Sequence, residues 1–207
     1  MRTWWNWYTH RTEAPGRLRH EGSTPFVRTS FFSMNNPENK IFDEEKYTLM
    51  LNIDKQSIDL SDLQVIAKQN NFDEREEFHI TIIGFRNGKE IGNVLDKLSS
   101  EDKQYELLRI KSLIDETDWS FELKSERYHI SKEYPRLKEL RESYIQIVNL
   151  PIINEFYDKL NNILGTNLES PPPHITLYTS GSDREKSKIG IGINSENELS
   201  KMNPKPI

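Results

Sequence analysis

Cysteine is absent from all 207 residues of the chain. Its absence excludes disulfides, thiolate nucleophiles and cysteine-ligated metal sites, and it fits a reducing compartment. Long apolar runs are absent too, because no stretch approaches the length of a transmembrane helix. Residues 1–20 also lack the uninterrupted apolar segment of a signal peptide. We therefore expect a cytoplasmic protein that does not bind membranes.

An excess of positive charge is missing as well, since the formal net charge is −5. Proteins that bind long duplex nucleic acid neutralise its phosphates with many Lys and Arg side chains. We therefore expect no long duplex partner, although a small anionic substrate still fits a local pocket. The sequence contains no P-loop, no glycine-rich dinucleotide fingerprint and no cluster of metal ligands, so we also expect no cofactor.

One short apolar motif that contains a His and a Thr occurs twice. Its first copy is Phe-His-Ile-Thr-Ile at residues 78–82, and its second is Pro-His-Ile-Thr-Leu at residues 173–177. In a β-strand, residues two apart share a face, so each His and its Thr point one way. The alternate aliphatic residues point the other way, into a core. Two such strands can bring two imidazoles and two hydroxyls to one cleft.

Each motif ends a similar strand–helix–strand unit. The first unit runs from a strand at 47–53 to the motif strand at 78–85, and the second from a strand at 144–149 to the motif strand at 173–179. The motif lies at nearly the same distance from the start of each unit. A repeat of this kind predicts two lobes related by a pseudo-two-fold axis, with one motif strand on either side of a groove.

The rest of the chain divides into three segments. Residues 1–45 contain many Pro and Gly breakers and several aromatic residues, and we interpret them as an irregular extension. Residues 46–182 form the main domain, and residues 183–207 form a polar segment that ends in a loose tail. Within the main domain, the pattern predicts a turn at Asn87-Gly88, a strand that starts near Trp119, and a helix between Pro151 and a capping Gly165.

The paired motif suits chemistry at a phosphodiester. Such a reaction needs a base to activate the nucleophile and an acid to protonate the leaving oxygen. Two histidines perform both tasks near neutral pH, because imidazole titrates there. The two Thr hydroxyls, each on the face of its His, can donate hydrogen bonds to the non-bridging phosphate oxygens.

The duplicated His-x-Thr motif and the repeat around it resemble the 2H phosphoesterase superfamily, over roughly residues 47–179. The resemblance implies an α+β fold of two lobes, with two antiparallel sheets flanking a central cleft and helices outside. It implies metal-independent cleavage of 2′,3′-cyclic phosphates or 2′-5′ linkages in RNA ends or small nucleotides, with an RNA-ligase-like reverse reaction. It gives catalytic roles to His79, Thr81, His174 and Thr176, with either His as the base.

Two other functions remain open at this point. One is hydrolysis of a cyclic oligonucleotide immune messenger, as in phage enzymes of the same superfamily. The other is a binding module that sequesters a nucleotide or oligonucleotide without cleaving it.

Three further residues are candidates for contacts with the substrate. If its strand stays regular, Tyr178 lies on the cleft face, and there it would hydrogen-bond to phosphate or stack on a base. The alternative is that its ring only packs at the edge of the cleft. Arg127 and His129 share a face near the end of the Trp119 strand, and Arg127 would bind phosphate bidentately. A solvated strand end is the alternative for both.

Overall fold

One antiparallel sheet joins the strands of the described chain, which comprises residues 31–32, 39–181 and 190–207 of the computed structural model. The strand order is β1-β6-β7-β8-β5-β3-β2, while β4 pairs with β8 and β9 with β6. The strands are β1 (Phe31–Phe32), β2 (Lys40–Asp43), β3 (Thr48–Ile53), β4 (Asp73–Glu74), β5 (Phe78–Ile83), β6 (Phe121–Tyr134), β7 (Glu139–Asn149), β8 (His174–Gly181) and β9 (Lys205–Pro206).

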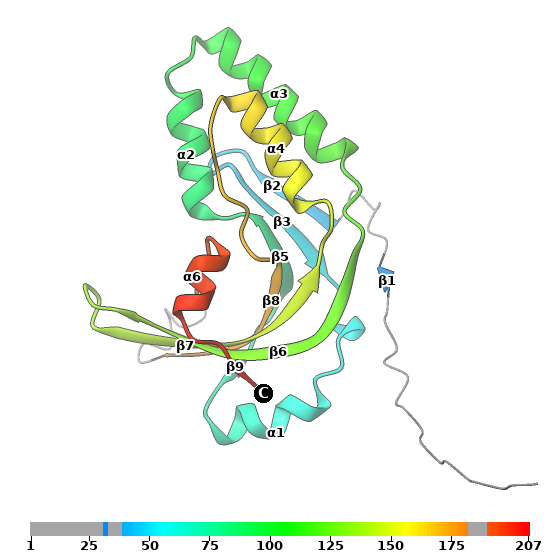
Figure 1. The fold of residues 1–207 in the computed structure, drawn as a ribbon, viewed down its shortest axis with the longest axis vertical. Helices are drawn as coiled ribbons and strands as arrows, with labels where there is room; N and C mark the ends of the chain where they lie inside the picture. The colour runs from blue at the N-terminus through cyan, green and yellow to red at the C-terminus, as the bar shows by residue number, and fades with distance from the viewer. Residues whose placement is uncertain (1–30, 33–38, 182–189) are drawn as a thin grey trace, which may run out of the picture.

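The helices of the described residues complete an α+β fold, as the sequence predicted. They are η2 (Lys55–Ser57), α1 (Ser61–Gln69), α2 (Phe85–Leu95), α3 (Ser100–Glu116), α4 (Ile153–Leu164) and α6 (Glu196–Lys201). Figure 1 shows α2, α3 and α4 grouped at one end of the sheet and α1 at the other. No helix among the described residues is long and apolar enough to cross a membrane.

The expectation of two separate sheets is wrong, because the two motif strands are neighbours. β5 pairs antiparallel with β8, and Ile80 lies opposite Ile175. β3 flanks this pair on one side and β7 on the other, so the two repeat units meet at their motif strands. A hydrogen-bonded contact at the middle of the repeat therefore joins what would otherwise be two sheets.

The connecting helix of each unit packs on the other unit. At the end of α1, in the first unit, Asn70 donates a hydrogen bond from Nδ2 to the hydroxyl of Tyr144 on β7, at 3.3 Å. In α4, in the second unit, the Tyr157 hydroxyl donates to the carbonyl oxygen of Ile82 on β5, at 2.8 Å. These reciprocal contacts fix the units against each other and hold the motif strands in register.

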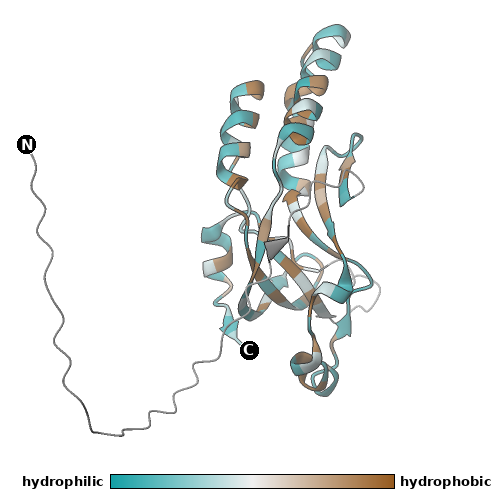
Figure 2. Ribbon diagram, turned by 90° about the vertical axis from the view of Figure 1, so that its right-hand side faces the viewer, coloured by the Kyte–Doolittle hydropathy of each residue, from teal (hydrophilic) through white to brown (hydrophobic). Residues whose placement is uncertain are grey.

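The core lies behind the motif strands. Ile80, Ile82, Ile175 and Leu177 are fully buried there, which confirms that they point into the core, as the sequence predicted. Figure 2 shows helices that carry both hydrophilic and hydrophobic residues, as expected of amphipathic helices that cover a sheet. The opposite faces of the motif strands, which carry His and Thr, do not pack in this core and are available for a functional site.

Both ends of the described chain hold more regular structure than the sequence predicted. Residues 40–43, expected to be irregular, form β2, and residues 31–32 form β1. The expected loose tail at 202–207 instead contains β9, and the Ile207 amide donates to the Arg127 carbonyl. These segments are too short to show a period of their own, and pairing with β3 and β6 orders them. The aromatic residues of the segment 1–30 lie outside the described residues.

The predicted turn at Asn87-Gly88 is also wrong, since both residues lie within α2. The Asn87 side chain donates to the Tyr157 hydroxyl at 2.8 Å and to the Glu169 carbonyl at 2.9 Å. Gly88 faces the backbone of Lys46 and Tyr47, in the turn between β2 and β3. Close packing between distant segments, and not a turn, therefore explains why Asn and Gly occur at these two positions.

Gly88→Ala is expected to destabilise the protein by about 1–3 kcal/mol, as overpacked positions do. Alanine would otherwise favour the helix by about 1 kcal/mol, so the close approach reverses the usual sign. A Cβ at Gly88 would overlap the Lys46 carbonyl oxygen and lie 3.0 Å from that of Tyr47. Urea unfolding measures the effect, with the exposed Asn93→Ala in the same helix as the control. Equal stabilities of Gly88→Ala and Asn93→Ala would refute this packing argument.

Candidate active site

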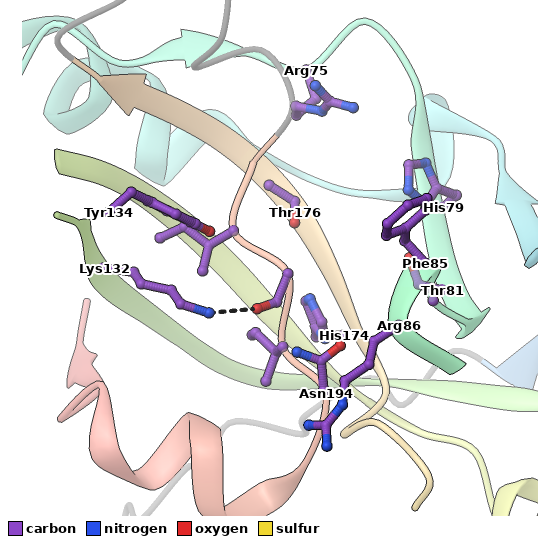
Figure 3. Close-up of a pocket in the computed structure, with 14 residues that line it drawn as sticks. Arg75, His79, Thr81, Phe85, Arg86, Lys132, Tyr134, His174, Thr176 and Asn194 are labelled. Carbon is purple, nitrogen blue, oxygen red and sulfur yellow. Dashed lines mark hydrogen bonds between the residues drawn. The ribbon is translucent and has the colours of Figure 1, made fainter. Parts of the chain in front are cut away.

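The four motif residues form two rows across the pair β5 and β8. Because Ile80 lies opposite Ile175, antiparallel pairing puts His79 across from Thr176 and Thr81 across from His174. Opposite residues share a face of the sheet, so all four side chains point away from the core. Figure 3 shows them around one pocket. The structure thus brings together the four residues that the sequence selected as catalytic candidates.

The pocket encloses about 390 Å³, and cationic side chains line it on more than one side. Its lining combines the motif residues with cations, aromatic rings and an irregular stretch of the C-terminal segment. The lining residues are Arg75, His79, Thr81, Gly84, Phe85, Arg86, Lys132, Tyr134, His174, Thr176, Ile191, Gly192, Ile193 and Asn194. Among these described residues there are three cations and no carboxylate, although the whole chain carries a net charge of −5. This lining favours an anion over a cation, although Glu198 and Glu90 partly neutralise Lys132 and Arg86.

His174 is held in one tautomer by the proline-rich segment before its strand. Its Nδ1 lies 2.7 Å from the carbonyl oxygen of Pro172, which can only accept a hydrogen bond, so Nδ1 carries the proton. The neutral ring therefore has its lone pair on Nε2. Only 9% of His174 is exposed, and the proline run before it fixes the direction of the chain. His174 can consequently exchange a proton at one defined atom.

Both imidazoles are biased toward the neutral form. Burial lowers the pKa of His79, and the positive charges of Arg75 and of a protonated His174 lower it further, while Glu77 opposes them. Burial also lowers the pKa of His174, and the hydrogen bond to Pro172 partly offsets this effect. Because each charged ring disfavours the other, the pair resists double protonation. One ring can thus be a base while the other holds the proton.

The C-terminal segment forms one wall of the pocket. Lys132 on β6 donates to Glu198 on α6, and Glu198 accepts hydrogen bonds from the backbone amide and the side-chain Nδ2 of Asn194. Since a carboxylate only accepts, the Asn194 amide nitrogen must face Glu198, which fixes the orientation of the side chain. A small core cluster that includes Ile191 and Ile193 holds the wall against the sheet. Residues 190–194 are therefore a structural part of the site.

Tyr178 does not contact the pocket, so its predicted place on the cleft face is wrong. The pairing of β7 with β8 slips between Tyr144 and Ile145, so that Thr176 and Tyr178 face consecutive residues. Leu177 is the extra residue of this β-bulge, which breaks the alternation of side chains. The Tyr178 ring is instead buried, with an edge-to-face contact to Tyr144.

Arg127 and His129 also lie away from the pocket, contrary to the prediction. Arg127 donates to the Asp62 carboxylate and to the Asp59 carbonyl, both at 2.6 Å, and so ties β6 to the start of α1. His129 lies 2.9 Å from the Glu142 carboxylate. Both side chains are half-buried and contact neighbouring residues. They are therefore neither substrate contacts in this pocket nor a solvated strand end.

Sequence reasoning missed the cations and aromatic residues of the wall. Lys132 and Tyr134 lie in β6 beyond His129, where the predicted strand had ended. Extending that strand would have shown that these two residues share a face with each other. Arg75 lies in a charged loop that looks fully solvated in the sequence. Asn194 follows a segment without any periodic pattern, and no sequence signal connects it to the motifs.

Comparisons with protein-family models, with curated proteins and with solved structures found no match. Among the described residues, no three His, Cys, Asp or Glu side chains gather in a group that would hold a metal ion. The geometry and charge of the pocket are therefore the basis for assigning a function.

Proposed function

We propose that this chain is a metal-independent phosphodiesterase that cleaves 2′,3′-cyclic phosphates or 2′-5′ linkages at RNA ends or in small nucleotides. The observation that carries this proposal is the pairing of the two His-x-Thr motifs across β5 and β8, inside a pocket lined by three cations. The resemblance to the 2H phosphoesterase superfamily, including its two-lobed symmetry, belongs to the same proposal.

The reaction follows from the four motif residues. Water attacks phosphorus while one imidazole takes its proton, and the bond from phosphorus to the leaving oxygen breaks as the other imidazole protonates that oxygen. Thr81 and Thr176 donate hydrogen bonds to the non-bridging oxygens, where charge builds up. The two rings have then exchanged protonation states, and proton exchange with solvent restores them. These proton transfers need no metal ion.

A panel of candidate substrates tests the proposal. Oligonucleotides with a 2′,3′-cyclic end, 2′-5′-linked oligonucleotides and cyclic di- and trinucleotides are incubated with the protein in excess EDTA, and the products are identified by mass spectrometry. We expect one of the first two classes to gain one water. Turnover of the cyclic oligonucleotides alone would favour the messenger hydrolase, and stoichiometric capture without product would favour a sequestering module.

The kcat/KM of the proposed reaction is expected to peak on the acid side of pH 6.5, the ordinary pKa of imidazole. The reaction needs one neutral and one protonated ring, so the profile is a bell between two pKa values of the free enzyme. Both pKa values are lowered, so both limbs move toward acid. A bound phosphate anion raises them again, so the maximum of kcat lies at higher pH.

This profile is measured with a diester substrate, because a phosphodiester does not titrate near neutrality. Both limbs of the profile then report ionisations of the enzyme. A kcat/KM maximum in the alkaline range would contradict the assignment of both proton transfers to these two histidines.

A further inference from the structure

Cations lie on both sides of the catalytic rows. The Arg75 backbone amide donates to the carbonyl oxygen of Leu177, so Arg75 lies beside the row of His79 and Thr176. Arg86 follows β5 at the start of α2, beyond Thr81. Figure 3 shows Arg75 at one end of the pocket and Arg86 at the other. An extended anion would therefore meet positive charge before and after the scissile phosphate.

Of the three cations that line the pocket, Arg75 is the one whose charge is least compensated within the described chain. Lys132 is paired with Glu198, and Arg86 lies 3.7 Å from Glu90. Arg75 is half-buried, and none of the ion pairs among the described residues includes it. The acidic residues next to it in the sequence are exposed, and one of them, Glu74, is paired with Lys55 at 2.6 Å. Arg75 lines the same pocket as His79, and its charge lowers the pKa of that imidazole.

The scissile phosphate does not require this arginine. A phosphodiester carries a single negative charge, and in the proposed reaction the two imidazoles and two hydroxyls already serve its oxygens. A guanidinium binds phosphate through paired N–H donors, and a half-buried one gains the most from such a partner. Arg75 therefore remains as a second anion-binding group in the same pocket.

We propose that Arg75 binds a second phosphate of the substrate, on the side of His79 and Thr176. The inference rests on the proposed function and narrows its substrate class. The substrate is then an oligonucleotide, or a nucleotide phosphorylated at its other end, and a lone nucleoside 2′,3′-cyclic phosphate is a poor substitute.

Two probes that differ by one phosphate test this inference: adenosine 2′,3′-cyclic phosphate with a 5′-hydroxyl, and the same compound with a 5′-phosphate. Wild-type kcat/KM is expected to be about 10- to 100-fold higher for the 5′-phosphorylated probe, the range of a charged hydrogen-bonded contact. Arg75→Gln brings the ratio of the two kcat/KM values close to one, and Arg75→Lys keeps part of it. Arg109→Gln, on the exposed side of α3 and outside the pocket, keeps the wild-type ratio.

A wild-type ratio near one, or a full ratio in Arg75→Gln, would overturn the second phosphate site while leaving the phosphodiesterase intact. If neither probe is turned over, the proposed function fails for this substrate class, and calorimetry of the same two compounds still tests the site. Tighter binding of the 5′-phosphorylated compound that Arg75→Gln abolishes supports the site, and equal binding of both compounds rejects it.

Discussion

His79→Ala and His174→Ala are each expected to lower kcat by about 100- to 10,000-fold, the usual contribution of a general acid or base. Each variant removes one of the two proton transfers and leaves the cations and Thr hydroxyls that bind phosphate. The affinity for a substrate or product is therefore expected to change far less than kcat. Steady-state kinetics and calorimetry with the product nucleotide separate the two effects.

The control for both variants is His129→Ala, which removes a half-buried histidine outside the pocket and is expected to keep wild-type kcat. A substrate with a p-nitrophenyl leaving group distinguishes the two roles, because an activated leaving group needs little protonation. The variant that lacks the acid regains most of its rate on this substrate, while the variant that lacks the base does not. Equal rescue of both variants would contradict separate acid and base roles.

Ile175→Ala is expected to destabilise the protein by about 2–5 kcal/mol, the cost of such a truncation in a core. Ile175 is fully buried, and its backbone pairs with Ile80 where the two repeat units meet. Both of its sequence neighbours, His174 and Thr176, line the pocket. A cavity behind the strand therefore weakens the contact that aligns the catalytic rows, and activity falls with stability.

Urea unfolding measures this effect against two reference variants. Ile175→Val removes one methylene and is expected to cost about 0.5–1.5 kcal/mol. Leu137→Ala, at a position 56% exposed in the turn between β6 and β7, is expected to change stability by about 0.5 kcal/mol or less. If Ile175→Ala costs no more than Leu137→Ala, the junction of β5 and β8 is not the packed centre described above.

Elements with a strong local period could be predicted from the sequence. The strand expected at 47–53 is β3 (Thr48–Ile53), and the helix expected between Pro151 and Gly165 is α4. Gly165 adopts a left-handed φ of 62° at the end of that helix, where a side chain would be strained. These features depend on residues close together in the chain, which is why the pattern reveals them.

The errors occur where distant segments decide the structure. Gly88 lies inside a helix, where the close backbone of Lys46 and Tyr47 leaves no room for a side chain, and nothing around Gly88 in the sequence signals that approach. A single bulge at Leu177 moves Tyr178 from the expected cleft face into the core. The direct pairing of β5 with β8, which joins the sheet, likewise depends on the tertiary fold.

The candidate site divides in the same way. The motif selected its four central residues because a period of two fixes which side chains share a face. Arg75, Lys132 and Asn194 come from three separate segments, and the sequence around them shows no repeated motif. The cations and the C-terminal wall, which bear on the choice of substrate, therefore became visible only in the structure.

The most direct test of the paired-histidine site is one incubation of an oligonucleotide that ends in a 2′,3′-cyclic phosphate, in excess EDTA, followed by mass spectrometry. The account predicts that the wild-type protein converts it to a product heavier by one water, and that the folded His79→Ala, His174→Ala double variant leaves it unchanged. Full activity in the double variant, or a wild-type reaction that EDTA abolishes, would contradict the account.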